Sequence, residues 1–153
     1  MFRTLMIGAV SAAVLTMAAS AFAQQAKYGT SAEAKAMLEK VVAAVKADKA
    51  KALASFNAGT DGFKDRDLQP FCFNATDGKI VATTHPSTLG TDVKALKDKT
   101  GKAFGEEIYT AVQEGKINEV SYRFPRPGET EPAPKTSFVT KVGDLGCGVG
   151  YFN

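Results

Sequence analysis

His85 is the only histidine in this chain of 153 residues, so a catalytic mechanism that uses an imidazole base has a single candidate. The sequence contains no Gly-x-Ser-x-Gly turn, no phosphate-binding P-loop and no His-Glu-x-x-His zinc site. Glu106 and Glu107 are adjacent carboxylates, but neighbours on a helix point about 100° apart, which is poor geometry for an acid/base couple. These residues predict a protein that is not an enzyme. A carboxylate pair assembled by the fold is the remaining catalytic alternative.

The two cysteines, Cys72 and Cys147, each lie within an apolar segment that is predicted to be a strand. In an exported protein such a pair can oxidise to a disulfide. The alternative is two buried free thiols that pack as small hydrophobic side chains. Two distant cysteines and one histidine are a poor ligand set for zinc, and the haem-attachment pattern C-x-x-C-H is absent. We therefore expect no metal and no cofactor.

The first 23 residues have the layout of a secretory signal peptide. Arg3 supplies a positive charge, an apolar run follows over residues 5–19, and Ala21-Phe22-Ala23 is a tripeptide of the kind that signal peptidase cleaves. An uncleaved membrane anchor is the alternative, but the run is rich in Ala and short for a bilayer core of about 30 Å. We predict a signal peptide at 1–23, a single mature domain at 24–153 and a periplasmic location.

The charges of the chain are close to balanced. The formal net charge is +3, and removal of Arg3 with the signal peptide lowers it by one. A protein so near neutrality is not expected to bind nucleic acid or an anionic membrane surface. No second apolar run of membrane length follows the first, so we expect no membrane insertion after signal cleavage.

A long helical segment is predicted at 31–57. Thr30-x-x-Glu33 is a capping box, in which the two side chains satisfy free amides of the first turn. Apolar residues recur at helical spacing along the first half of the segment: Met37, Leu38, Val41, Val42 and Val45. Asp48 can cap a second helix, and Gly59 is placed to end it. One bent helix and two separate helices both remain open, and packing against a sheet is expected in either case.

Five strands are predicted from apolar alternation and from the turn residues between them. They cover 70–75, 79–84, 116–124, 135–142 and 145–152. A short helix is expected over 92–98. A firmer helix carries Phe104, Ile108 and Val112 on one face. The proline-rich stretch 125–134 is expected to be a loop, because proline has no amide to donate to a sheet.

The last strand alternates glycines with larger residues. Gly146, Gly148 and Gly150 all face one way at the two-residue period of a strand. A face without side chains lets another element come close. We expect the long N-terminal helix to pack there, with close approach of a ligand as the alternative.

A series of short stretches follows a fixed order along the chain. They are Asp77-Gly78-Lys79, His85-Pro86, Leu89-Gly90, Asp98-x-x-Gly101-Lys102, Gly115, Tyr122-x-Phe124-Pro125-x-Pro127-Gly128 and Pro134-Lys135-x-Ser137-Phe138-Val139. In this order and spacing they resemble the single Cache domains of the type 2 subgroup, which occur in bacterial chemoreceptors and histidine kinases. The chain departs from that pattern at Phe124, where the family often has Trp, and before the last glycines, where a Trp is missing.

The resemblance implies an α+β, PAS-like fold. Its five-stranded antiparallel sheet would have the long N-terminal helix on one face and short helices and loops over a small pocket on the other. The first and last strands would be neighbours in that sheet, which makes a Cys72–Cys147 disulfide geometrically possible.

Ligands of such domains are often short organic acids, and a buried carboxylate needs charge-assisted donors. The candidate donors near the matching positions are His85, Tyr122, Lys135, Arg126, Tyr109 and Arg123. We rank His85, Tyr122 and Lys135 highest. Packing in the core is the alternative for the two tyrosines, and exposure to solvent is the alternative for Arg126 and Lys135. For His85, which precedes a proline, the alternative is that it only terminates a strand. Arg123 points away from Tyr122 along the strand, so the two cannot line one pocket without a bulge.

The function that follows from the resemblance is an extracytoplasmic module that binds or senses a small molecule, without an output domain of its own. A membrane receptor or kinase is the expected partner. The alternative is a structural or accessory protein of a membrane signalling or transport system that keeps the fold without a ligand.

Overall fold

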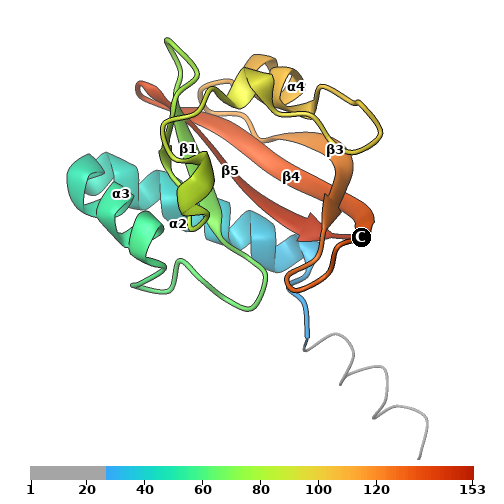
Figure 1. Ribbon diagram of the computed structural model, residues 1–153. Helices are drawn as coiled ribbons and strands as arrows, with labels where there is room; N and C mark the ends of the chain where they lie inside the picture. The colour runs from blue at the N-terminus through green and yellow to red at the C-terminus, as the bar shows by residue number, and fades with distance from the viewer. Residues whose placement is uncertain (1–26) are drawn as a thin grey trace, which may run out of the picture.

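The computed structural model describes residues 27–153, so the signal peptide predicted at 1–23 lies outside the described residues. The described part is an α+β domain, in which helices flank a five-stranded antiparallel sheet (Figure 1). This architecture confirms the expected fold class. Among the helices of residues 27–153, none combines the length and the apolar character needed to cross a bilayer.

The N-terminal helical segment consists of two helices, α2 (Ser31–Ala47) and α3 (Lys49–Ala58). Asp48 separates them because its backbone is extended, with φ −160° and ψ 97°. The Asp48 carboxylate accepts a hydrogen bond from the Lys51 amide and so starts α3. Of the two possibilities left open by the sequence, the structure has two helices.

Both ends of the helical segment are closed as the sequence predicts. At the start of α2, the Thr30 side chain accepts from the Glu33 amide, and the Glu33 carboxylate accepts from the Thr30 amide. At the end of α3, Gly59 adopts a left-handed backbone with φ 65°, which a residue with a side chain rarely adopts. The capping box and the glycine stop are therefore confirmed.

The sheet places the first and last strands side by side. Its strands are β1 (Pro70–Asn74), β2 (Ile80–Ala82), β3 (Asn118–Pro125), β4 (Pro132–Val142) and β5 (Leu145–Phe152). They are arranged in the order β2-β1-β5-β4-β3, and every neighbouring pair is antiparallel. This order confirms that β1 and β5 are neighbours.

Between β2 and β3 the chain crosses the sheet face through short helices. These are the 3-10 turns η1 (Pro86–Thr88) and η2 (Val93–Ala95), followed by helix α4 (Phe104–Ala111). In Figure 1, α4 lies on the opposite side of the sheet from α2, and η2 packs against α4. The sheet is therefore covered on both faces, by α2 on one side and by the β2–β3 connection on the other.

The proline-rich segment is shorter as a loop than expected, because β4 begins at Pro132 rather than at 135. Pro132 and Pro134 pair only with β3, opposite Pro125 and Arg123. The ladder between β4 and β5 starts one residue later, at Lys135. Towards β5, Pro132 and Pro134 have no strand partner. A proline is tolerated there because no backbone amide is needed for a hydrogen bond on that side.

The alternation along β5 separates the two faces of the sheet. Cys147 and Val149 belong to the apolar core that contains α2. Gly146 and Gly148 face the other way, where an added Cβ would lie 2.3 Å from the Phe73 ring and 2.5 Å from the Phe71 ring, respectively. The expectation that the long helix packs on the glycines is wrong. The larger residues of β5 face α2, and the glycines make room for aromatic rings of β1.

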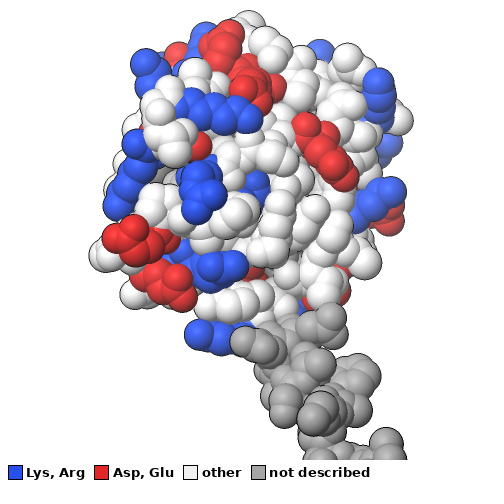
Figure 2. All heavy atoms as spheres, turned by 90° about the vertical axis from the view of Figure 1, so that its right-hand side faces the viewer, with Lys and Arg blue, Asp and Glu red and all other residues white. Residues whose placement is uncertain are grey.

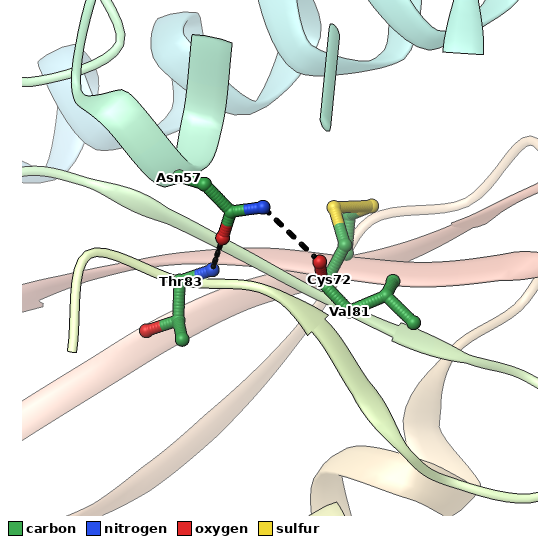
Figure 3. The surroundings of a disulfide bond; sticks show 5 residues. Asn57, Cys72, Val81 and Thr83 are labelled. Carbon is green, nitrogen blue, oxygen red and sulfur yellow. Dashed lines mark hydrogen bonds between the residues drawn. A yellow bond between two sulfur atoms is a disulfide. The ribbon is translucent and has the colours of Figure 1, made fainter. Parts of the chain in front are cut away.

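A disulfide joins Cys72 of β1 to Cys147 of β5, which are directly opposite each other in the ladder (Figure 3). Both residues are fully buried under the helical layer. Next to it, the Asn57 amide of α3 donates to the Val81 carbonyl and accepts from the Thr83 amide. The disulfide and this amide fix the strands β5, β1 and β2 and the helix above them as one unit.

Removal of the disulfide should lower stability without changing the fold. The bridge closes a loop of 75 residues, for which chain entropy gives about 4 kcal/mol of stabilisation. We expect the double variant C72A/C147A to lose about that much free energy of unfolding in urea, with a native circular dichroism spectrum. The oxidised wild type measured without reductant is the control, and equal midpoints for the two proteins would contradict this prediction.

Candidate ligand-binding site

A cavity of about 160 Å³ lies on the α4 face of the sheet. Its apolar wall combines side chains of β1, β2 and α4 with one from the connection between η2 and α4. These residues are Phe71, Ile80, Leu96, Phe104 and Ile108. Polar side chains enter the cavity from the ends of β2 and β4 and from β3. The three sequence-predicted residues ranked highest, His85, Tyr122 and Lys135, all line it.

Tyr122 of β3 forms one side of the cavity and is held in place by two contacts. Its ring stacks on Phe104 with centroids 4.2 Å apart and planes 6° from parallel. Its hydroxyl lies 2.9 Å from the Ser137 hydroxyl of β4. Burial raises the pKa of Tyr122 to about 12, although the hydrogen bond to Ser137 acts in the opposite direction. Tyr122 is therefore a neutral hydroxyl at physiological pH.

Two lysines line the cavity, and Lys135 is the more buried one, whereas Lys97 is exposed. The Lys135 ammonium lies 4.6 Å from the centre of the Phe152 ring and 5.2 Å from that of Phe124, so aromatic faces stabilise its charge. Burial lowers the pKa of Lys135 to about 8, and the nearby Asp67 carboxylate partly offsets this effect. A carboxylate that entered the cavity would stabilise the charged form of the Lys135 ammonium, which burial disfavours.

Gly150 creates the space that Lys135 occupies. A Cβ at this position would lie 2.6 Å from the Lys135 side chain and 2.7 Å from the Ser137 hydroxyl. Gly150 pairs with Ser137 in the β4–β5 ladder, so two small residues are opposite each other at the floor of the cavity. The alternative that the sequence left for the glycine face, close approach of a ligand, is geometrically possible at this glycine.

His85 lies three residues after the end of β2 and enters the cavity as a neutral ring. Its Nε2 atom is 2.7 Å from the Gln69 side-chain nitrogen, so Nε2 accepts the hydrogen bond and Nδ1 carries the proton. The Gln69 oxygen in turn accepts from the Thr84 hydroxyl, which fixes the orientation of the amide. Burial lowers the pKa of His85, and the positive charges of Lys135 and Lys64 lower it further.

The other three sequence-predicted residues lie outside the cavity wall. Tyr109 of α4 donates to the Ala75 carbonyl at 2.9 Å and closes the β1–β2 turn. Arg123 is exposed and donates to the Pro132 carbonyl at 2.9 Å. The Arg126 guanidinium lies over the Tyr28 ring, 5.3 Å from its centroid, and over the Phe152 ring. The structure therefore brings together three of the six predicted donors, and their role as ligand donors stays a prediction.

Five polar residues that line the cavity are not among the predicted donors: Gln69, Thr83, Thr88, Lys97 and Ser137. Ser137 follows Lys135 by two residues, so the strand period places both on one face. That signal was present in the sequence. Gln69 precedes β1, and nothing in its local sequence indicates the hydrogen bond to His85.

The protein surface beside the C-terminus carries charges of both signs. Figure 2 shows basic side chains on both sides of a largely uncharged band, with acidic side chains among them. A surface of this kind does not concentrate anions strongly. Attraction of an anionic ligand would therefore depend on individual buried cations rather than on the surface as a whole.

Comparison with protein families gives a match to the model described as Cache domain, over residues 16–153. The chain belongs to the Cache domain family. This Cache domain is similar in fold to a methyl-accepting chemotaxis protein of Vibrio parahaemolyticus, with TM-score 0.62 and 22% identity over 78% of this chain and 86% of that one.

Two further solved structures share the fold over 90% of this chain and 99% of theirs. One is described as the structural basis for carboxylic acid recognition by a Cache chemosensory domain, with TM-score 0.62 and 19% identity. The other is a periplasmic sensor domain of a chemotaxis protein, with TM-score 0.57 and 23% identity. At these identities the similarity shows the fold.

One curated relative is the methyl-accepting chemotaxis protein McpP of Pseudomonas putida. It is 32% identical to this Cache domain over 60 residues, which are 39% of this chain. The match spans 11% of the length of McpP. The two proteins therefore share a segment of sequence, and the remainder of McpP has no counterpart in the match.

The cavity of this Cache domain offers donors for an anion and apolar surface for a carbon chain. Lys135 supplies a positive charge, and Tyr122 and Ser137 supply hydroxyl groups next to it. Within residues 27–153, no three His, Cys, Asp or Glu side chains are grouped to hold a metal ion. The arrangement is suited to holding a small anion through hydrogen bonds and the charge of Lys135.

Asp98 fixes the segment that roofs the cavity. One carboxylate oxygen accepts from the Thr100 amide, the Thr100 hydroxyl and the Lys102 amide, and the other accepts from the Arg123 amide of β3. These hydrogen bonds, that from Thr100 first, lower the pKa of Asp98 to about 2. Asp98 thereby joins the chain before α4 to the edge of the sheet and blocks an amide of the edge strand.

Substitution of Asp98 should loosen this roof. We expect D98N to unfold at lower urea concentration than the wild type at pH 7, because Asn cannot accept all four hydrogen bonds as a carboxylate does. The carboxyl has a lowered pKa in the folded state, so its contribution is lost as the pH falls from about 4 towards 2. The difference between D98N and wild type should therefore shrink between pH 7 and pH 2.5. The control is E119Q, which changes an exposed carboxylate of β3, and a difference between D98N and wild type that does not depend on pH would contradict the assignment.

Proposed function

We propose that this Cache domain binds a short organic acid in the cavity between α4 and the sheet. The observation that supports the proposal is Lys135, a largely buried cation at the edge of a small apolar cavity. A lysine in such a place is costly for the folded protein, because burial disfavours its charged form. A bound carboxylate would offset this cost by pairing with the ammonium.

The dimensions of the cavity favour a compact guest. An apolar cavity of about 150 Å³ in another protein holds benzene, and the cavity of this domain is about 160 Å³. The carboxylate would lie at Lys135, with Tyr122 and Ser137 as hydrogen-bond partners. The carbon chain would contact Phe104 and Ile108. A monocarboxylate with a short apolar tail matches this division of polar and apolar surface.

The relatives support a sensory role outside the cytoplasm. A structure of the same fold is described as recognising a carboxylic acid, and others belong to chemotaxis proteins. A disulfide is typical of an oxidising compartment such as the periplasm. We therefore propose that the exported domain reports its ligand to a membrane receptor or kinase and catalyses no reaction.

A thermal-shift screen of residues 24–153 against short carboxylates tests this proposal. A ligand at about 100 times its dissociation constant should add about 2.7 kcal/mol to the free energy of unfolding. A panel of two- to five-carbon acids would also rank tail length against cavity size. No shift with any member of the panel would favour the alternative, an accessory protein without a ligand.

The variant K135M should separate binding from stability. We expect carboxylate affinity to fall by roughly 30-fold, as for loss of a charge-assisted hydrogen bond, while the free protein gains about 1 kcal/mol. Calorimetric titration and urea unfolding measure the two effects. The matched control is K35M, which replaces an exposed lysine of α2. Unchanged affinity in K135M would overturn the assignment of Lys135 as the ligand cation.

Carboxylate affinity should also depend on pH in a defined direction. The pKa of Lys135 in the free protein is about 8, and the ligand needs the charged ammonium. We expect affinity to be constant from pH 6 to 7 and to fall about tenfold per pH unit well above pH 8. Isothermal titration across this range measures the profile. Affinity that stays constant up to pH 9.5 would contradict a direct charge interaction with Lys135.

A further inference from the structure

Three segments of the chain border the mouth of the cavity. Most residues that line the cavity are buried or half-buried, but three of them are exposed: His85 before η1, Lys97 before α4 and Phe124 near the end of β3. These exposed residues mark where the cavity opens to solvent. A ligand has to pass between their segments to reach Lys135.

Two of the three segments are fixed to the sheet. Phe124 pairs with Ala133 in the β3–β4 ladder, so its backbone is part of the sheet itself. Lys97 directly precedes Asp98, whose carboxylate accepts a hydrogen bond of 3.1 Å from the Arg123 amide of β3. Neither segment can move away from the mouth without breaking hydrogen bonds to a strand.

The third segment, residues 86–89, is held only by its own local contacts and is here named the arch. Among residues 27–153, every hydrogen bond of the arch lies within 85–91, such as that from the Thr88 amide to the His85 carbonyl at 3.0 Å. None of its four residues is buried. A segment with few buried contacts and only local hydrogen bonds opens at a lower free energy than the sheet around it.

Both ends of the arch are anchored, so the arch can turn while the neighbouring strands stay in place. Before it, the Thr84 hydroxyl and the His85 ring both contact the Gln69 side chain. After it, the Gly90 amide donates to the Ile80 carbonyl at 2.8 Å. Gly90 has φ 81°, and no atom lies within 4 Å of the position that a Cβ would take. The backbone at Gly90 therefore has the freedom and the space of a hinge.

Leu89 is the apolar side chain that the arch carries at the mouth. It is 48% exposed, more than any other large hydrophobic residue of 27–153. A single exposed leucine is common on a protein surface, but this one directly follows Thr88, which lines the cavity. An inward turn of the arch would remove the Leu89 side chain from water, which favours the closed arrangement.

We propose that the arch is the gate of the cavity. The ligand enters between the arch and the fixed segment at Lys97, and the arch then turns about Gly90 so that Leu89 covers the apolar tail of the ligand. Closure excludes water from the pair formed by Lys135 and the ligand carboxylate, which strengthens their attraction. This inference rests on the proposed function only for the chemistry of the ligand, because the motion of the arch is a property of the free domain.

Relaxation dispersion of the free, ¹⁵N-labelled domain tests the motion. We expect exchange on the microsecond-to-millisecond timescale at the amides of Ser87, Thr88 and Leu89. The amides of Lys97 and Lys99, on the fixed side of the mouth, are the internal control and should show none. Arch amides without exchange, or exchange of equal size on the two sides of the mouth, would overturn the proposal.

The variant L89S tests what closes the gate, with propionate as the probe. Loss of the apolar side chain should weaken propionate binding about fivefold, because the closed state loses buried apolar surface. The weakening should come from faster dissociation, which the line shapes of an NMR titration measure. The matched control is S87A, an exposed position of the same arch, and it should bind as the wild type does. Equal propionate affinity in L89S and wild type would refute the role of Leu89.

The two experiments separate this inference from the proposed function. Propionate that binds with equal affinity to L89S and wild type, in a domain whose arch shows no exchange, would overturn the gate and leave the proposed function standing. Exchange confined to the arch of a domain that binds propionate and no other acid of the panel would support both. Exchange confined to the arch of a domain that binds no acid at all would support the gate and refute the proposed ligand class.

Discussion

The pairing of β1 with β5 is the constraint on which the rest of the structure depends. It joins the first strand of the chain to the last, with Cys72 opposite Cys147 at its centre. These strands come from distant parts of the sequence, so their pairing encloses the intervening chain, including the β2–β3 connection, in one long loop. The connection must then return over one face of the sheet, and this is the face that carries the cavity.

The alternation along β5 gives the two faces different roles. On the helical face, Cys147 and Val149 fill the space under α2, and packing there is continuous. On the opposite face, the missing side chains of Gly146 and Gly148 leave room for aromatic rings, and that of Gly150 leaves room for the Lys135 side chain. One strand, β5, therefore packs against the helices with its larger residues. Its glycines leave the space in which the Lys135 side chain lies on the sheet.

The sequence predicts most of the fold, since strand period, helix caps and turn glycines are local signals. Thr30 with Glu33, Gly59 and the first and last strands lie where local rules put them. The face on which α2 packs could not be predicted, because alternation in β5 separates two faces without saying which one meets the helix. At the site, Lys135 follows from a family pattern, whereas Gln69 owes its place to a contact with a residue 16 positions away.

The cavity combines groups whose burial lowers the stability of the fold with contacts that reduce this cost. Burial of Lys135 destabilises the free protein, and the Asp67 Oδ2 atom, which has no hydrogen-bond partner among residues 27–153, adds to this cost. The rings of Phe124 and Phe152 and the attraction between Lys135 and Asp67 reduce this cost. The disulfide joins β1 to β5, and the hydrogen bonds of Asp98 join the chain before α4 to β3, so covalent and polar contacts hold the elements around the cavity. A rigid frame around an incompletely satisfied charge is the arrangement expected of a site that is completed by a ligand, since a purely structural core would gain from an apolar residue at position 135.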